Sequence, residues 1–395
     1  MNVVKKIVFM HHTNIIGGGS LSLFDIIDCL SDTNYSPHVV FPKSNSASSY
    51  LKSKCLDDSY EYTEVDCPFI TLSNFNGGPN LIFMLFKFLR NIFFVFKWNK
   101  LIRNMNEEIF VLNSIVQVPL VLLLKYHNKK VICCVRETKQ ERRGIVNLLM
   151  SRLLDMCDCV TFLTKFDMLN WSLIKADTYI LPDIVNLKYS NIEQRGTSKS
   201  FNRDSLTLLY TGGANYLKGY DVLLESLTYL NIKLNVVVCG VIPPKINLRF
   251  IILRTQLYLF HVKCQSLKLQ INKNIKITVF GKMSNVEELI NKCDVIVIPF
   301  NIAHQSRNLY EAGYFKKPVI ISDFTCYEDN VIDGFNCITF NPNDPRDLAD
   351  KISLFYSKPT EEVILMGQNN HSMTISNHNH ETVSKLFINI LSNVG

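Results

Sequence analysis

Three polar residues follow an apolar run near residue 300, and their types suit recognition of a phosphorylated ligand. The run VIVIPF at Val295–Phe300 has the composition of a buried strand, and behind it come a polar loop with His304 and Arg307 and a helical pattern with Glu311. An arginine can pair with phosphate, and a carboxylate near a helix start can accept two ribose hydroxyls. We therefore expect a ligand site here, although a solvated loop histidine and a glutamate favoured by the helix dipole are ordinary alternatives.

A glycine turn earlier in the same half of the chain could hold a diphosphate. In TLLYTGGANYLKGYDVLL a strand ends near Thr211, Gly212 and Gly213 make a turn, and Lys218 precedes a helix. Glycine lets the backbone approach a ligand, a helix N-terminus favours an anion, and the lysine adds a full charge. The order of residues is neither a Walker loop nor a GxGxxG fingerprint, and such turns are also common as simple connections between strand and helix.

A similar turn, Gly17–Gly19, follows the first apolar run and leads through Ser20 into a helical pattern. Its backbone N–H groups could face a ligand, and Ser20 could cap the helix. Both glycine turns come at the carboxyl end of an expected strand, which is where open α/β sheets bind ligands.

The elements that position these turns alternate between strand and helix patterns in two halves of the chain. The strand patterns of the first half include KKIVFM, HVVFP, EIFVL, KKVICCV and CVTFLT, and those of the second half include SLTLLY, LNVVV, IKITVF, DVIVIPF and PVIISD. We expect an α/β protein with two Rossmann-like domains in tandem and a ligand cleft between them. The predicted domains are 1–187 and 205–395, joined by a polar linker at 188–204, with roughly the last 20 residues packing back on the first domain. Residues 246–274 read as an insertion with a helix.

The composition favours a folded protein over a disordered chain, because 47% of the 395 residues are hydrophobic and 19% are charged. The formal net charge of +7 is not gathered in one block, which argues against a nucleic-acid binder and is compatible with a phosphate-bearing ligand or an anionic membrane surface. The 12 cysteines show no zinc spacing and are expected to be reduced thiols of a cytosolic protein. The N-terminal apolar run is too short for a signal peptide.

The segment Leu81–Trp98 is nearly long enough to span a bilayer, but Lys87, Arg90 and Lys97 interrupt it. Two interpretations remain open, a helix buried in its own domain and a basic, aromatic helix lying on a membrane interface. In the second case, substitution of Phe93 and Phe94 by aspartate should weaken vesicle binding.

Taken together, the motifs resemble the group 1, family four retaining glycosyltransferases, whose two-domain fold is called GT-B. The resemblance rests on GGANYLKG at Gly212–Gly219, on Glu311 followed by KKPVIISD, on YEDNVIDGFNCITF, and on LPDIVN at Leu181–Asn186 as a degenerate form of the segment that ends the first domain. It covers most of the chain and preserves the order of the motifs.

The resemblance implies a nucleotide diphosphate sugar as donor, held mainly by the second domain, and an acceptor held mainly by the first. By position, Lys218 would neutralise the departing diphosphate and Glu311 would hold the ribose. Gly281 and Lys282 would lie near the base, and Gly18 and Gly19 would approach the phosphates. No metal and no cofactor is expected.

Two positions depart from the family pattern. Gly213 replaces an arginine and Ala303 replaces a glutamate, whereas His304 and Arg307 match an H-x-x-R element of one branch, so that Arg307 would restore the phosphate charge. A first-domain loop that often carries a donor-facing histidine reads CCVRET, which makes Arg136 and Glu137 candidates for sugar or acceptor contact or, equally, members of a strand-end ion pair.

The expected function is transfer of a sugar to a glycan or lipid-linked acceptor, with retention of configuration and without an enzyme nucleophile, at the cytoplasmic face of a membrane. Two alternatives remain. One is a catalytically silent subunit that binds protein partners, suggested by Gly213 and Ala303; the other is a sugar-nucleotide epimerase, which needs a carboxylate pair that Ala303 removes. The sugar, the acceptor and the choice between UDP and GDP stay open.

Overall fold

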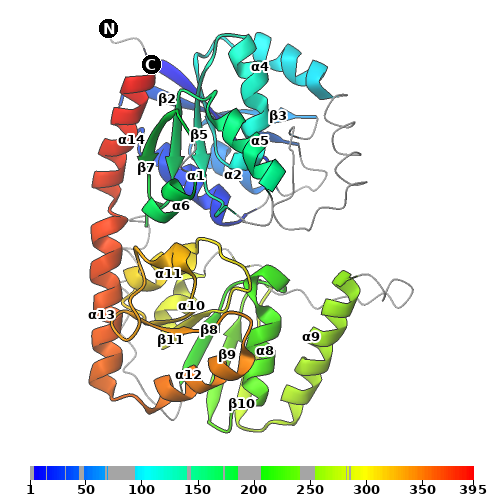
Figure 1. Cartoon of the computed structure of the whole chain (residues 1–395), viewed down its shortest axis with the longest axis vertical. Coiled ribbons are helices and arrows are strands. Elements are labelled where there is room, and N and C mark those ends of the chain that lie inside the picture. The colour runs from blue at the N-terminus through cyan, green and yellow to red at the C-terminus, as the bar shows by residue number, and fades with distance from the viewer. Residues whose placement is uncertain are drawn as a thin grey trace. The chain divides into compact units, whose positions relative to one another are not determined.

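The chain divides into two compact units, shown in the computed structural model of Figure 1. The structure describes residues 4–395 except 15, 32, 44–48, 67–68, 70–93, 140–143, 172–173, 186–205, 241–253, 282 and 284–285. The first unit comprises Met1–Ile184 together with Asn379–Gly395, and the second comprises Val185–His378. The C-terminal segment therefore belongs to the first unit, while the linker expected at 188–204 lies outside the described residues.

A parallel sheet of seven strands forms the centre of the first unit, in the order β3-β2-β1-β4-β5-β6-β7. The central strands β1 and β4 are buried on both faces of the sheet. This explains why their sequences are continuous hydrophobic runs. The sheet order reverses between β1 and β4. The strands are β1 (Lys5–Met10), β2 (Tyr35–Pro42), β3 (Glu61–Val65), β4 (Ile109–Leu112), β5 (Lys130–Val135), β6 (Cys159–Phe162) and β7 (Asp177–Ile180).

Helices cover both faces of this sheet. One hydrophobic core lies against α1, α2 and α14, and the other lies against α4, α5 and the helical residues 94–103. The chain's last helix thus completes the core of the first unit, and the ring of Phe387 lies 6.3 Å from that of Phe9 of β1, between centroids. The bounds are α1 (Gly18–Asp28), α2 (Tyr50–Asp57), a 3-10 helix η1 (Ile115–Leu120), α4 (Val121–Tyr126), α5 (Gly144–Leu154), α6 (Lys165–Asn170) and α14 (His380–Val394).

The second unit has a parallel sheet of six strands in the order β10-β9-β8-β11-β12-β13. Its order reverses between β8 and β11, which are direct neighbours: Val295 pairs with Leu208 and Ile296 with Leu209. The strands are β8 (Thr207–Tyr210), β9 (Leu234–Val238), β10 (Ile275–Val279), β11 (Val295–Ile298), β12 (Val319–Ser322) and β13 (Cys337–Phe340).

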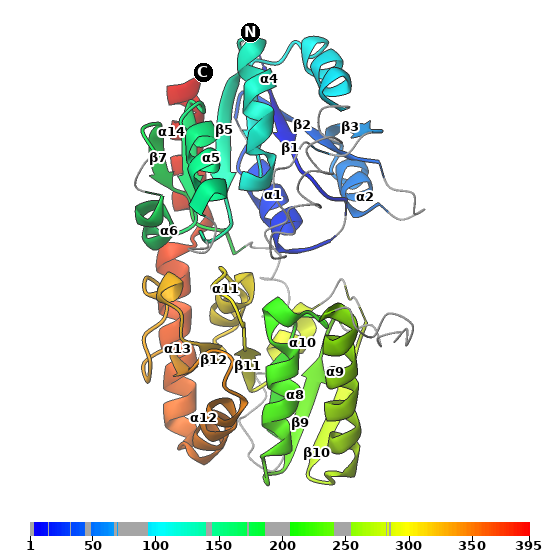
Figure 2. The same cartoon turned by 45° about the vertical axis from the view of Figure 1, so that its right-hand side comes forward.

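The helices of the second unit include the pair α11 and α13, which lie side by side in both ribbon views (Figures 1 and 2). Gly313 allows this approach, because a Cβ there would lie 1.9 Å from Oγ1 of Thr374. The bounds are η4 (Tyr216–Lys218), α8 (Tyr220–Thr228), α9 (Arg254–Ile271), α10 (Glu287–Lys292), α11 (Arg307–Tyr314), η6 (Thr325–Tyr327), α12 (Pro345–Ser357) and α13 (Thr360–Asn377). Helix α9 is the helix expected within 246–274, and the α/β prediction with two Rossmann-like domains is confirmed.

Candidate functional site

The second unit brings two predicted motifs together at the reversal of its sheet order. The glycine turn follows β8, the loop before α11 follows β11, and these two strands are adjacent. A reversal of this kind leaves room outside the carboxyl ends of the strands, because the connections from the two strands run to opposite sides. The motifs at Gly212 and His304 therefore share one edge of one sheet.

The glycine turn after β8 is built for close approach. Gly213 has φ of +71° and Gly219 has φ of +65°, a region that side chains rarely adopt. A Cβ on Gly212 would lie 2.3 Å from the hydroxyl of Tyr210, and one on Gly219 would lie 1.5 Å from the carbonyl oxygen of Pro299. The hydroxyl of Tyr210 donates to the carbonyl oxygen of Gly213 at 2.8 Å, which closes the turn.

Lys218 ends the short helix η4 and directs its ammonium toward Phe300 rather than toward a carboxylate. Its Nζ atom lies 4.0 Å from the centroid of that ring. Desolvation by burial lowers the pKa of Lys218 to about 8, so the side chain is mostly charged at pH 7. Within the described residues no carboxylate lies at ion-pair distance from this ammonium, which leaves a positive charge at the glycine turn without an anionic partner.

The loop after β11 carries the second motif. Arg307 is the first residue of α11, and its Nε donates to Oε1 of Glu311 at 2.9 Å. Both side chains are about nine-tenths buried, and the pair spans one helical turn. The ring of His304 lies 6.1 Å from that of Phe300, between centroids. The structure thus pairs two residues that the sequence assigned to different parts of the ligand.

Of the two residues expected near the base, Gly281 and Lys282, the structure describes only Gly281. Gly281 follows β10 and is exposed, and its carbonyl oxygen accepts a hydrogen bond from the backbone of Gly240 at 3.1 Å. Lys282 lies outside the described residues.

In the first unit, the turn Gly17–Gly19 also stands at the reversal of the sheet order, between β1 and β4. Helix α1 begins at Gly18, and the hydroxyl of Ser20 accepts from the backbone N–H of Gly17 at 2.9 Å. Gly17, and not Ser20 as expected, is the N-cap residue of α1; Ser20 is the third residue of the helix, and its hydroxyl satisfies the N–H of Gly17. The N–H groups of Gly18 and Gly19 precede the first intrahelical bond and point out of the helix start.

A buried polar network fixes this first turn. The amide of Asn113 donates to the carbonyl oxygen of Gly19 at 2.8 Å and contacts Nδ1 of His11 at 3.0 Å. Nε of Arg136 donates to Oδ1 of Asn113 at 2.9 Å, and its Nη1 pairs with Asp183 at 2.5 Å. Because Asn113 donates to Nδ1, the proton of His11 lies on Nε2, and burial holds the pKa of this histidine well below its usual value.

Arg136 and Glu137 have partners inside the first unit. Arg136 forms the strand-end ion pair that the sequence allowed, but with Asp183 instead of Glu137. The carboxylate of Glu137 accepts from the hydroxyl of Ser114 and from the backbone N–H of Ile115 at 3.2 Å, and burial raises its pKa. The Nη2 atom of Arg136 is buried and has no hydrogen-bond partner among the described residues.

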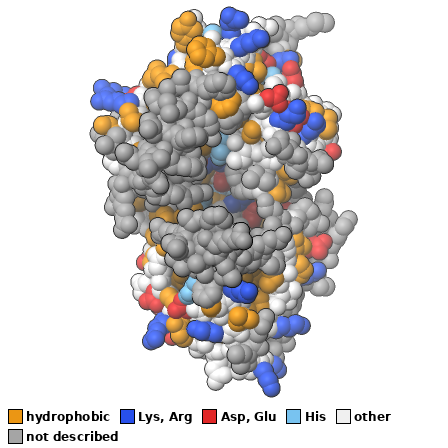
Figure 3. All heavy atoms as spheres, turned by 90° about the vertical axis from the view of Figure 1, so that its right-hand side faces the viewer, with side chains coloured by type: hydrophobic (Ala, Val, Ile, Leu, Met, Phe, Trp, Pro, Cys, Tyr) orange, Lys and Arg blue, Asp and Glu red, His pale blue; other side chains and the backbone are white. Residues whose placement is uncertain are grey.

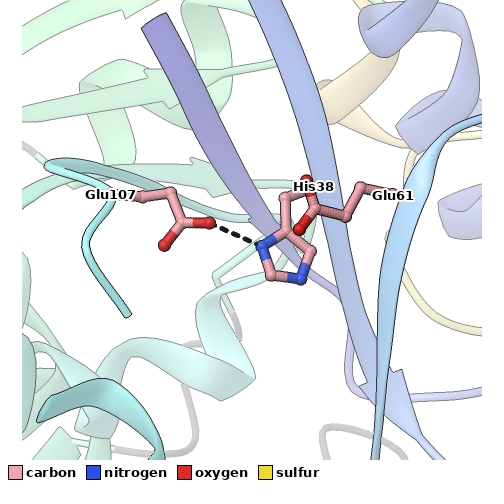
Figure 4. Close-up of side chains that lie close together, drawn as sticks. All are labelled: His38, Glu61 and Glu107. Atoms are coloured by element: carbon pink, nitrogen blue, oxygen red, sulfur yellow. Dashed lines mark hydrogen bonds and ion pairs between the residues drawn. The ribbon is translucent and has the colours of Figure 1, made fainter. Parts of the chain in front are cut away.

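A third cluster has ligand atoms close enough for a metal ion. His38, Glu61 and Glu107 lie together on the sheet of the first unit (Figure 4). Nδ1 of His38 bonds to Glu107 at 2.8 Å and Nε2 to Thr63 at 2.8 Å, while Glu61 pairs with Lys6 at 2.7 Å. The ammonium of Lys6 already supplies the positive charge that these carboxylates require, so we interpret the cluster as an ion-pair network.

The sequence analysis did not assign a role to three residues that lie just after apolar strands. Asn113 comes directly after β4, and Phe300 and Asn301 come after β11 and Pro299. Asn301 bonds to three groups of the Lys218 turn, through its backbone N–H to Leu217 and through its amide to Tyr216 and Asp221. Their position at the carboxyl edge of the sheet was the available signal, since it is the same one that indicated Gly212.

Comparison with known proteins gives one family and many similar structures. Residues 192–373 match the family described as glycosyl transferases group 1. A sequence search among curated proteins finds no match.

The similar solved structures cover nearly the whole chain. HepE from Anabaena, solved in complex with UDP and glucose, has 14% identity and a TM-score of 0.74, and the match covers 98% of this chain and 99% of that one. Sucrose-phosphate synthase from Thermosynechococcus elongatus has 14% identity and a TM-score of 0.71, with 98% of both chains covered. A glycosyltransferase from Rickettsia africae has 15% identity and a TM-score of 0.67, covering 99% of this chain and 98% of that one. At such identities the likeness is one of fold.

Proposed function

We propose that this chain is a retaining hexosyltransferase that uses a UDP-sugar, since its residues 192–373 match the family of group 1 glycosyl transferases. The acceptor in this proposal is a glycan or a lipid-linked glycan of surface polysaccharide or glycoconjugate synthesis. The observation that carries it is the ammonium of Lys218, which stands at the glycine turn without an anionic partner among the described residues. The UDP bound to HepE supports the choice of nucleotide.

In this mechanism the leaving diphosphate is stabilised by charges and dipoles that exist before it binds. Lys218 and the start of α8 neutralise the diphosphate as the anomeric bond breaks. Glu311 accepts the ribose hydroxyls, and Arg307 holds its carboxylate in place through the bond from Nε and adds positive charge near the phosphates. Attack occurs on the face of the leaving group, so no enzyme nucleophile is required. Gly18, Gly19, Gly281 and His304 are secondary donor contacts in this proposal, and Arg136 and Glu137 border the acceptor.

A thermal-shift screen with UDP, GDP, CMP, ADP and NAD tests the donor site. A ligand at 100 times its dissociation constant adds about 2.7 kcal/mol to the free energy of unfolding. We expect UDP to stabilise the protein, the shift to persist in EDTA, and Lys218→Ala or Glu311→Ala to remove it. Lys292→Ala, on an exposed side chain of α10, is the matched control for loss of a lysine. A protein that none of the five compounds stabilises is better described as the silent subunit.

The stereochemical course has its own test. Slow hydrolysis of UDP-glucose, followed by proton NMR, shows which anomer of glucose forms first. A retaining enzyme releases the α-anomer before mutarotation, and first release of the β-anomer contradicts retention.

Peripheral membrane attachment is the remaining part of the proposal. We now assign it to Phe96 and Tyr126 in place of Phe93 and Phe94. Most of Leu81–Trp98 lies outside the described residues; within the described part, Trp98 is fully buried and Phe94 packs against the core. Phe96 is 77% exposed, and so is Tyr126 of α4. A hydrogen bond of 2.8 Å between Asn99 and His127 joins the two helices. No described helix is both long and apolar enough to cross a bilayer.

Basic side chains adjoin these exposed aromatic residues. Lys97, Lys100 and Arg103 are exposed on the helical residues 94–103, where no acidic residue occurs. The upper end of Figure 3 shows hydrophobic and basic side chains side by side. Aromatic rings with surrounding cations suit the interface of an anionic membrane at the cytoplasmic face.

Sedimentation with vesicles tests this attachment. We expect binding to vesicles that contain phosphatidylglycerol and weaker binding to pure phosphatidylcholine. Phe96→Asp combined with Tyr126→Asp should release the protein, whereas Leu365→Asp, on an exposed side chain of α13, should not. Equal binding by all variants contradicts this location.

A further inference from the structure

The ring of Phe300 is the group that faces the ammonium of Lys218. Phe300 comes two residues after the end of β11, behind Pro299, and its side chain is only 1% exposed. Its centroid lies 4.0 Å from Nζ of Lys218, well inside the range in which the negative face of an aromatic ring attracts a cation. The ring is thus both a wall of the glycine turn and an electrostatic partner of its lysine.

The backbone on either side of Phe300 is fastened to the turn that carries Lys218. The backbone N–H of Asn301 donates to the carbonyl oxygen of Leu217 at 3.1 Å, and its side-chain amide donates to that of Tyr216 at 2.8 Å. On the other side, the carbonyl of Pro299 lies so close to Gly219 that no side chain fits there. These contacts fix the backbone around Phe300 relative to the backbone of the turn that carries Lys218, and so keep the two side chains within reach of each other.

The surroundings of the turn favour an aromatic ring as the partner of the Lys218 ammonium. Burial disfavours the charged form of Lys218. Asp221, which begins the helix after the turn, accepts from Asn301 at 3.2 Å, and Glu311 of α11 accepts from Arg307. His304, the titratable group beside the ring, faces Phe300. A cation–π contact is worth more where water is excluded, and it supplies attraction without the neutralisation that a carboxylate would cause.

We propose that Phe300 is a positioning residue for the diphosphate of the donor: its ring holds the ammonium of Lys218 at the turn in the free enzyme and stays behind it when the diphosphate binds. The inference rests on the proposed function, because it requires that Lys218 contact the donor. It assigns to an aromatic side chain a role that would otherwise fall to a second charged residue.

Binding of UDP to matched variants tests the proposal. Phe300→Leu removes the ring face while keeping an apolar side chain, and we expect it to weaken UDP binding about tenfold in calorimetry at pH 7. Phe300→Tyr keeps the ring face and should retain affinity within about threefold. Phe355→Leu removes another fully buried phenylalanine of the second unit and controls for general loosening of the core. Thermal unfolding in each case verifies that the variant is folded.

A double-mutant cycle distinguishes action through Lys218 from a purely structural role. In the Lys218→Met background, Phe300→Leu should change UDP affinity by less than about twofold, since the group it positions is gone. Equal effects of Phe300→Leu in both backgrounds overturn the proposal. Should Phe300→Leu fail to fold, fluorinated phenylalanines introduced at position 300 replace it, because they weaken the ring quadrupole without changing its shape, and affinity should fall stepwise with each fluorine.

The outcomes separate this inference from the proposed function. If the unmodified protein binds no UDP, or if Lys218→Met leaves its affinity unchanged, the donor site itself is wrong. If Lys218→Met weakens binding but neither Phe300→Leu nor the fluorinated series does, the donor site stands and only the positioning role of Phe300 is refuted.

Discussion

The two units place a glycine turn at the same point of their sheets but treat the nearby cation in opposite ways. In the first unit, the guanidinium of Arg136 is paired with Asp183 and bonded to Asn113, which in turn fixes Gly19. In the second unit, the ammonium of Lys218 faces the ring of Phe300. A cation that is neutralised internally maintains the shape of a turn, whereas one held by an aromatic ring keeps its charge for an incoming anion. The same topology therefore places an internally paired cation in one unit and, in the other, the cation that we propose binds the donor.

The largest effect should come from breaking the ion pair of the first unit. Arg136→Met removes one partner of a buried ion pair with Asp183, a change that costs about 3–5 kcal/mol. Denaturant unfolding should show this loss, and the double variant Arg136→Met with Asp183→Leu should recover most of it. A single variant as stable as the unmodified protein would show that this pair is not what holds the turn.

The equivalent change in the second unit should affect the ligand and not the fold. Lys218→Met removes the charge at the glycine turn, and we expect UDP affinity to fall about 100-fold, in line with loss of a charge-assisted contact. The free energy of unfolding should rise at pH 7, because burial disfavours the ammonium and methionine has no charge to desolvate. Calorimetry with UDP and thermal unfolding measure the two changes; a loss of stability together with affinity would place Lys218 among the structural charges.

The glycines of the two turns should also differ in how much a side chain at their position destabilises the fold. Gly219→Ala puts a side chain at a φ of +65° and against the carbonyl of Pro299, and should cost at least about 2 kcal/mol of unfolding free energy. Gly18→Ala meets no atom within 4 Å and lies in the first turn of α1, so we expect a change below about 0.5 kcal/mol. Denaturant unfolding of the two variants checks this, and similar costs for both would contradict the difference in backbone constraint.

The sequence predicted most of the strands that carry the two glycine turns, but not the side-chain contacts around these turns. Apolar runs such as VIVIPF mark strands that are covered on both faces, and a polar or glycine residue behind such a run lies at the ligand edge, so the positions of Gly212, Lys218 and Glu311 followed from pattern alone. β3 was not predicted because its sequence EYTEV lies at the sheet edge and is mostly polar. The pattern also did not predict the partner of Arg136. Arg136 pairs with Asp183 and not with its sequence neighbour Glu137, because the carboxyl ends of β5 and β7 lie at the same edge of the sheet.

The pH dependence of the two units should differ in sign and in the property affected. Burial lowers the pKa of Lys218 to about 8, so the side chain is mostly charged at pH 7 and loses its charge as the pH rises through 8. UDP affinity should then fall up to about tenfold per pH unit above 8, since binding requires the protonated lysine. Lys218→Met, with its already low affinity, should lack this dependence.

In the first unit, burial lowers the pKa of His12 from near 6.5 to about 4. The unfolded chain therefore binds a proton that the folded chain does not between these values, and stability should decrease as the pH falls from 6.5 to 4. His12→Asn removes this proton uptake, so the stability of the unmodified protein relative to the variant should decline over that range in urea unfolding at several pH values. A constant difference between the two proteins would mean that His12 titrates alike in both states, and that the first unit does not depend on a neutral histidine beside its turn.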